Sequence, residues 1–182
     1  MIEKSTIQKV LDIFFDNPTK EFHLRELSRL LKFSMPTIVA STDILSREKL
    51  IIKTKGKVIT KVQADRENMN FIRFKRLHNL ENIYKSGVID SISSLYNNPK
   101  NIILFGSYRK GDDDENSDID IAIEIIGNEE PKIHELGVIS KFAYRKDVLV
   151  NLHIFSRNKI DINLFSNIAN GIVLEGFLEV RP

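Results

Sequence analysis

The 182-residue chain contains no cysteine, which removes disulfide bridges and cysteine-bound zinc from the ways in which it could be stabilised. It has no uncharged apolar run close to the roughly 18 residues that a membrane span requires. The first ten residues carry Glu3, Lys4 and Lys9 and lack the apolar segment of a signal peptide. These absences suit a reducing interior, and we expect a cytoplasmic location.

The net charge is only +2, but charges of opposite sign are separated along the chain. Residues 1–64 hold 12 Lys and Arg against 7 Asp and Glu, whereas residues 101–182 hold 9 against 14. A basic front half can meet a polyanion, and an acidic back half can hold divalent cations. Small domains also differ by a few charges without a functional reason, so this separation alone assigns no function.

The first third of the chain shows helical spacing of apolar residues followed by a hairpin pattern. The expected elements are helices over residues 5–16 and 23–31, a third helix capped by Ser34, and strands at 50–54 and 58–62 around Gly56. This order and spacing resemble the winged helix-turn-helix family. The resemblance implies a first domain of residues 1–64, and we expect a connecting helix over 65–87 and a second domain over 88–182.

A winged helix commonly binds DNA through its third helix and its wing. The residues expected to contact DNA are Thr37 and Ser41, on the outward face of the third helix, and Lys53, Lys55 and Lys57 around the wing turn. No arginine, the usual reader of guanine edges, stands on that helix face. The alternative use of the domain is dimerisation or contact with a partner protein.

Residues 66–97 are expected to be helical, with a break at Gly87. The first stripe of apolar residues is Phe71, Phe74, Leu77, Leu80, Ile83 and Tyr84. We expect these stripes to pack on neighbouring elements, and the first can also form the seam of a homodimer. From residue 101 the pattern changes. Strands are expected at 102–105, 119–126 and 148–155, and helices at 131–146 and 159–169.

Chemistry is indicated where the strand 102–105 ends at Gly106-Ser107 and the next strand begins with Asp118-Ile119-Asp120. Glycine lets the backbone turn sharply, and the following N–H groups with the Ser107 hydroxyl can bind phosphate. Strand alternation puts both carboxylates on one face, roughly 6.5–7 Å apart. Two carboxylates beside a phosphate-binding turn are typical of a magnesium site.

Gly106-Ser107, Gly111 and Ser117-Asp118-Ile119-Asp120-Ile121 resemble the signature of the nucleotidyltransferase superfamily that includes DNA polymerase β. The compact size and the ending at 171–176 are similar to its minimal branch. The resemblance implies an α+β fold, with the winged helix followed by a small mixed sheet with helices on one side. It implies transfer of a nucleoside monophosphate from a triphosphate, with ATP expected, to a hydroxyl.

In that scheme Gly106, Ser107 and Ser117 hold the triphosphate, and Asp118 and Asp120 hold Mg²⁺ or Mn²⁺. The superfamily places a third acid on the next core strand, where Asn151 stands here. Asparagine offers an oxygen to a metal but cannot take a proton.

His153 shares the face of Asn151 and can accept a proton, since histidine titrates near neutral pH. We therefore assign His153 a catalytic role, with Asp147 and Glu124 as alternatives by strand parity. The spacing of Gly106 and Gly111 is that of a P-loop, but Asp112 and Asp113 follow where Lys and Ser or Thr are required. Their negative charges would repel phosphate, so a P-loop is not expected.

Two functions follow from this pattern. The first is a metal-dependent nucleotidyltransferase whose winged helix binds DNA or a partner. Minimal nucleotidyltransferases often pair with a helical HEPN-type toxin, so the resemblance allows an antitoxin role. The second is a DNA-binding regulator with a degenerate, non-catalytic nucleotide-binding domain. The paired Asp118 and Asp120 favour the first function, and Asn151 favours the second.

Overall fold

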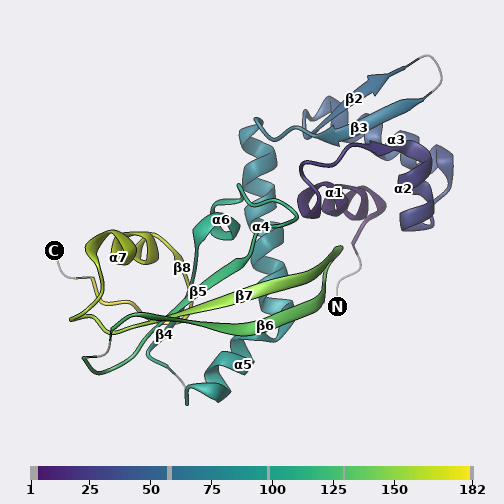
Figure 1. The fold of residues 1–182 in the computed structure, drawn as a ribbon. Coiled ribbons are helices and arrows are strands. Elements are labelled where there is room, and N and C mark those ends of the chain that lie inside the picture. The colour runs from purple at the N-terminus through teal and green to yellow at the C-terminus, as the bar shows by residue number, and fades with distance from the viewer. Residues whose placement is uncertain (1–3, 57–58, 98, 129, 181–182) are drawn as a thin grey trace. The chain divides into compact units, whose positions relative to one another are not determined.

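The computed structural model describes residues 4–56, 59–97, 99–128 and 130–180 (Figure 1). The chain separates into two compact units, Met1–His78 and Asn79–Pro182. The border between them falls inside one long helix, α4 (Met69–Ser86). The domain boundaries at residues 65 and 88 that the sequence predicts stay a prediction. No helix in the described part of the chain is long and apolar enough to cross a membrane.

The first unit begins with three helices, α1 (Thr6–Asp16), α2 (Leu24–Leu31) and α3 (Met35–Arg47). Ser34 caps α3 by accepting a hydrogen bond from the Thr37 N–H, as the sequence predicts. Ser5 caps α1 in the same way by accepting from the Gln8 N–H. Each helix turns an apolar stripe inward. The buried core includes Val10, Ile13, Phe14, Phe22, Leu27, Ile38, Leu45 and Val62.

A small sheet of three antiparallel strands completes this arrangement, in the order β1-β3-β2. Its strands are β1 (Phe22–His23), β2 (Ile51–Lys55) and β3 (Thr60–Ala64). The expected hairpin is confirmed, whereas β1 is a two-residue strand that the sequence did not predict. The chain order of three helices and a closing hairpin is that of a winged helix.

Helix α4 ends at Ser86, and Gly87, whose backbone is left-handed with φ +77, separates it from α5 (Val88–Leu95). The break predicted at this glycine is therefore confirmed. The apolar stripe of α4 divides in two. Phe71 and Ile83 are buried, whereas Phe74, Leu77 and Tyr84 are exposed. A homodimer seam along the exposed part stays a prediction.

The second unit is built on a mixed five-stranded sheet in the order β6-β7-β5-β4-β8. Its strands are β4 (Asn101–Phe105), β5 (Ile119–Glu124), β6 (Lys132–Phe142), β7 (Arg145–Phe155) and β8 (Ile172–Gly176). Among neighbouring strands of the described residues, only β5 and β7 pair in parallel. Two short helices complete the unit, α6 (Gly106–Lys110) and α7 (Ile162–Ala169).

The helix predicted over residues 131–146 is wrong, because this segment is strand β6 and the start of β7. The two strands form a long antiparallel hairpin (Figure 1), joined through Ala143, whose φ is +55. Ile133, Val138 and Ile139 are β-branched, and Gly137 lowers helix stability inside the segment. The backbone N–H and C=O groups of β6 form hydrogen bonds with β7, and no local sequence pattern predicts that pairing.

Helices pack on both faces of the sheet, which corrects the expectation of helices on one side. On one face of the sheet, Ile121 of β5 and Leu152 of β7 belong to the same buried cluster as three helix residues. These are Ile83 near the end of α4, and Ile89 and Ile92 of α5. The other face meets Ile168 of α7, which packs with Ile103, Phe105, Ala122 and Phe155.

Candidate active site

The turn after β4 brings the backbone against one of the predicted acids. Gly106 has φ +73, and a Cβ atom built there would lie 2.5 Å from Asp120 Oδ2. Only glycine combines this left-handed backbone with such a close approach. Ser107 follows in the first turn of α6 and is half-buried. The backbone turn that the sequence assigns to phosphate binding therefore lies beside Asp120.

The two carboxylates predicted as metal ligands occupy the start of β5. Asp118 immediately precedes the strand, and Asp120 pairs with Phe105 of β4. Both aspartates are half-buried, whereas the intervening Ile119 and the next residue, Ile121, are fully buried. Strand alternation therefore sends the aspartates to the face opposite the isoleucine core.

Strand β7 adds two polar side chains to the same face. In the parallel register Asn151 lies beside Asp120, and its amide Nδ2 donates to Asp118 Oδ2 at 3.3 Å. His153 Nε2 lies 3.2 Å from Asp120 Oδ1. The His153 ring meets the Phe105 ring edge-on, with centroids 4.8 Å apart. The structure thus brings together four side chains that the sequence selected, and their chemical roles stay predictions.

Ser117 has a structural task that the sequence did not reveal. Its hydroxyl accepts a hydrogen bond from the Asp114 N–H at 3.0 Å and donates to Asp114 Oδ1 at 3.2 Å. The Ser117 carbonyl accepts from the Arg145 guanidinium. These contacts hold the loop before β5, so the assignment of Ser117 to nucleotide binding would require its hydroxyl to exchange partners.

The acidic loop 112–115 is anchored rather than freely solvated. Asp113 is buried, and its Oδ1 accepts from the Asn79 side-chain amide at 2.8 Å. The Arg145 guanidinium lies 3.8 Å from the other oxygen of Asp113 and donates to the Glu115 carbonyl at 3.3 Å. Asn79 also donates to the Tyr108 carbonyl at 2.8 Å. Contacts from distant elements thereby position the segment that leads into Asp118.

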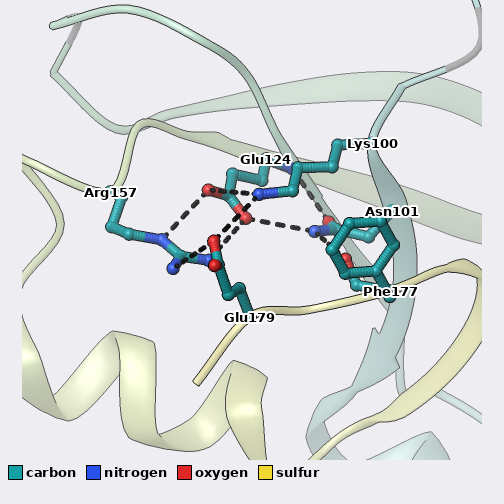
Figure 2. A network of polar contacts seen from close by, with 6 residues as sticks. All are labelled: Lys100, Asn101, Glu124, Arg157, Phe177 and Glu179. Carbon is teal, nitrogen blue, oxygen red and sulfur yellow. Dashed lines mark hydrogen bonds and ion pairs between the residues drawn. The ribbon is translucent and has the colours of Figure 1, made fainter. Parts of the chain in front are cut away.

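Glu124 shares the strand face of Asp120 but is committed elsewhere (Figure 2). Its carboxylate is 8% exposed and accepts two hydrogen bonds from Arg157, at 3.1 and 3.0 Å. Asn101 Nδ2 donates to the same carboxylate at 3.2 Å. Because the guanidinium and amide use both oxygens, Glu124 is not available as the third acid that strand parity allowed.

Asp147, the other alternative, is exposed near the start of β7 and has φ +53. This backbone interrupts the strand alternation on which its assignment to the site depended. Strand parity therefore gives no reason to place its carboxylate with Asp118 and Asp120.

The oxygens gathered here suit a hard cation in kind. Magnesium is commonly held by one or two carboxylates plus substrate phosphates, and Asp118, Asp120 and the Asn151 amide supply oxygen donors of that type. Across the described residues, however, no three His, Asp or Glu side chains stand close enough to hold a metal ion by themselves. The fit to a metal therefore depends on a triphosphate, or on a further side chain, to complete the donor set.

The positions predicted for DNA contact have varied surroundings in the first unit. Ser41 is 3% exposed, so its outward placement is wrong; it lies three residues after Ile38 and four before Leu45, on the buried stripe of α3. Thr37 is half-buried, and its hydroxyl lies 2.7 Å from Ser34 Oγ. DNA contact by Thr37 stays a prediction.

The predicted wing lysines also differ from one another. Lys53 Nζ lies 2.7 Å from Asp43 Oδ1 and 3.1 Å from Thr42 Oγ1, with its side chain only 7% exposed. Its ammonium therefore has partners inside the unit. Lys55 is exposed, and Lys57 lies outside the described residues.

Two exposed arginines on α2 were not among the residues that the sequence predicted for DNA contact. Arg25 and Arg29 are exposed, and in the part of the chain that the structure describes neither forms an ion pair. They line a pocket of about 790 Å³ together with His23, Leu24, Glu26, Leu30, Met35, Ile59 and Thr60. The helical spacing of Arg25 and Arg29 on one face was the available signal.

Known proteins offer a comparison for part of the chain. A search of curated proteins gives no match. Among solved structures, the adhesin competence repressor AdcR from Streptococcus pyogenes matches with a TM-score of 0.38 and 12% identity, over 51% of this chain and 68% of that chain. The family model described as "Nucleotidyltransferase domain" matches residues 85–169, which contain the Gly106 turn, both aspartates and β7. Residues 85–169 are therefore a nucleotidyltransferase domain.

Proposed function

We propose that the protein is a metal-dependent nucleotidyltransferase that moves a nucleoside monophosphate from a triphosphate, ATP in the first instance, to a hydroxyl group. One observation carries the proposal. Asp118 and Asp120 lie on one face of the sheet, and the left-handed Gly106 turn abuts Asp120, inside a segment that matches the nucleotidyltransferase domain model.

Each group then has a defined task. The backbone after Gly106 and the Ser107 hydroxyl hold triphosphate oxygens, and Asp118 and Asp120 supply carboxylate oxygens to Mg²⁺ or Mn²⁺. The metal, when bound, offsets the negative charge of the triphosphate. His153 Nε2 donates its hydrogen to Asp120 Oδ1, 3.2 Å away, so the other ring nitrogen, Nδ1, takes the proton of the acceptor hydroxyl, and Asp120 stabilises the imidazolium. The acceptor oxygen bonds to the α-phosphorus, and pyrophosphate leaves.

Transfer from ATP labelled at the α-phosphate tests this function. We expect label to become attached to an acceptor only with Mg²⁺ or Mn²⁺, and to be lost in the Asp118→Asn/Asp120→Asn variant while its thermal unfolding stays cooperative. His153→Ala should lower turnover by about 10²–10⁴-fold if the imidazole is the base. Transfer that persists in the double variant would contradict the proposed site.

The acceptor is the finer part of the proposal. Minimal nucleotidyltransferases of the resembled branch pair with HEPN-type proteins, and we propose a hydroxyl on such a helical partner as the acceptor. Co-incubation of the two proteins with labelled ATP would put the label on the partner. Label that appears instead on nucleic acid or a small molecule would exclude the antitoxin role.

A second function, a regulator that binds nucleotide without transferring it, is favoured by Asn151. This side chain donates a hydrogen bond to Asp118 where the resembled superfamily has an acid. Calorimetry with ATP and Mg²⁺ separates the two functions. Metal-dependent binding without transfer to any acceptor would support the regulator.

We propose that the winged-helix-like unit binds duplex DNA through phosphate contacts. Arg25 and Arg29 are exposed on α2, whereas Lys53 has partners within the unit. Replacing both arginines with Gln should weaken binding to all sequences and reduce the slope of log K against log salt by up to about 0.9 per contact. Lys53→Gln is the matched control and should leave the slope unchanged. If the wild-type protein binds no DNA at low salt, the unit is a partner-docking module.

A further inference from the structure

Strand β6 runs along the edge of the sheet next to β7, and its register aligns one more acid with the candidate site. Glu135 pairs with Asn151, and Asn151 pairs in turn with Asp120. The three residues thus form one row across β6, β7 and β5. Side chains directly opposite each other on neighbouring strands have Cβ atoms about 4.5–5.5 Å apart.

The face on which Glu135 lies follows from its neighbours. The preceding residue, His134, pairs with Leu152, which is fully buried in the core on the α5 side. His134 Nδ1 lies 2.7 Å from the Tyr96 hydroxyl, just beyond the end of α5. Since side chains alternate along a strand, Glu135 lies on the opposite face, which is the face of Asn151 and His153.

The Glu135 carboxylate is also uncommitted. Glu135 is exposed, and within the described ranges it has neither a hydrogen bond nor an ion pair. This distinguishes it from Glu124, whose carboxylate is held by Arg157. The register of β6 shifts between Glu135 and Gly137, and Gly137 has φ +111. Such bulges commonly re-aim a side chain beside an active site.

We propose that Glu135 supplies the third carboxylate of the metal site, reaching from the edge strand over the position where Asn151 lacks a charge. The proposal rests on the proposed function, because it completes the site formed by Asp118 and Asp120. Because no three acidic or histidine side chains of the described residues are close enough to hold a metal ion as they stand, Glu135 must turn toward Asp118 and Asp120 when the ion binds. The donor set then becomes three carboxylates and one amide oxygen, and all four are hard ligands suited to Mg²⁺ and Mn²⁺. The third acid of the resembled superfamily stands at the position of Asn151 on β7, whereas here it would come from Glu135 on the neighbouring strand β6. Glutamate has one methylene more than aspartate, which spans part of the added distance to Asp118 and Asp120.

Binding of Mn²⁺ to the full chain, followed by electron paramagnetic resonance of the free ion, tests the ligand directly and without turnover. We expect Glu135→Gln to weaken Mn²⁺ binding about 10-fold or more, within the range seen when metal-site residues are removed. Glu135→Asp should also weaken it, because the shorter side chain reaches less far. Glu175→Gln on β8, at the opposite edge of the same sheet, is the matched control and should bind like the wild-type protein.

A compensating variant isolates the charge from the fold. Asn151→Asp/Glu135→Gln should recover the affinity that Glu135→Gln loses, because the acid returns to the middle strand. Thermal melts of each variant without metal identify any loss of folding, and the surface position of Glu135 predicts none.

The failures are distinguishable. If Asp118→Asn/Asp120→Asn abolishes Mn²⁺ binding while Glu135→Gln binds like the wild-type protein, the Glu135 assignment is overturned and the proposed site stands. If the aspartate double variant still binds Mn²⁺ normally, the proposed site itself fails. An effect of Asp147→Asn in place of Glu135→Gln would also overturn the assignment, in favour of the hairpin end of β7.

Discussion

The side-chain amide of Asn151 donates a hydrogen bond to Asp118 Oδ2 at 3.3 Å. Through this contact a neutral side chain neighbours one of the two predicted metal ligands and satisfies one of its oxygens. The amide oxygen of Asn151 is a ligand type that can bind a cation, whereas its amide nitrogen donates to the Asp118 carboxylate. The contact between Asn151 and Asp118 therefore joins polar groups at the start of β5 and on β7 without placing two negative charges side by side.

Replacing Asn151 with Asp should make the fold of the second unit depend on metal. The donated hydrogen bond is lost, and a second carboxylate faces Asp118, so the melting temperature should fall in EDTA and recover with Mg²⁺. If His153 is not the base, turnover should also rise in Asn151→Asp, up to the roughly 10²–10⁴-fold that a positioned proton acceptor contributes; if His153 is the base, turnover should change little. Asn128→Asp, in the exposed loop after β5, adds the same charge and should change neither property. Equal melting curves with and without Mg²⁺ would contradict the expected carboxylate contact.

Replacing Gly106 with Ala should impair the site through steric contact. The new Cβ would lie 2.5 Å from Asp120 Oδ2, and the backbone would hold an unfavourable φ of +73. We expect a loss of about 1–3 kcal/mol in the free energy of unfolding from the strained backbone. Metal affinity should fall as well, because Asp120 must move.

Gly87→Ala provides a matched comparison for this change. Gly87 has a similar φ of +77, but a Cβ there meets nothing within 4 Å. It should show the loss of stability without the loss of metal affinity. If the two variants bind Mn²⁺ equally well, the approach of the Gly106 turn to Asp120 has no bearing on the site.

The parts of the site that the sequence predicted are those set by local patterns. The buried run of β4, the left-handed glycine after it and the alternation of Asp118 and Asp120 need only neighbouring residues to be interpreted. The placement of Asn151 and His153 beside them follows from one further step, the pairing of consecutive core strands.

The parts that the sequence missed depend on contacts between distant segments. Residues of β6 acquire their strand conformation by pairing with β7, and their local mixture of polar and apolar side chains also suits a helix. Arg145 reaches back 28 residues to the Ser117 carbonyl, and spacing along the chain does not encode such a contact. The burial of Ser41 was recoverable, because its helical spacing from Ile38 and Leu45 places it on their face.

Replacing Arg157 with Met should destabilise the second unit. The change removes two hydrogen bonds from Glu124 and leaves a nearly buried carboxylate with weaker compensation, which costs about 1–3 kcal/mol. Lys159→Met is the matched control, since Lys159 pairs at 3.1 Å with the well-exposed Glu130 and such pairs contribute at most about 1 kcal/mol.

The same network separates structure from chemistry. Because Arg157 and Asn101 occupy the carboxylate of Glu124, Glu124→Gln should lower the melting temperature and leave metal affinity unchanged. Chemical denaturation and Mn²⁺ titration of these variants give both quantities. A loss of metal affinity in Glu124→Gln at unchanged stability would return Glu124 to the candidate site.

A buried histidine of the first unit predicts that stability depends on pH. His78 is 5% exposed, with Nε2 2.8 Å from Asp16 Oδ1 and Nδ1 3.2 Å from Asp12 Oδ1. Burial lowers the pKa of the imidazole, but the hydrogen bonds and charges of the two aspartates outweigh it and raise that pKa to about 9. Burial raises the pKa of Asp12, and its contacts with His78 and Lys4 more than offset this, so the pKa of Asp12 is lowered.

The direction of the effect follows from proton binding. The folded state keeps the His78 proton up to about pH 9, whereas a histidine in the unfolded chain loses it near its ordinary pKa of 6.5. The stabilisation is therefore complete below pH 6.5 and is lost as the pH rises through 9. The shift corresponds to at most about 3 kcal/mol. The Asp12 contribution is present above its ordinary pKa of 3.8 and is lost as the pH falls through its lowered value.

Thermal melts between pH 6 and 10, on the wild-type protein and on His78→Gln, test this prediction. Gln keeps hydrogen-bonding groups but has no charge to offer Asp12 and Asp16, so the variant should be much less stable at pH 6. The difference between the two proteins should shrink as the pH rises, because the wild-type imidazole loses its proton near pH 9. His23→Gln, which changes an exposed histidine of the same unit, should follow the wild-type curve throughout. A stability difference that stays constant from pH 6 to 10 would mean that His78 acts through its packing against Phe15, whose ring centroid lies 5.2 Å from that of the imidazole, and not through its charge.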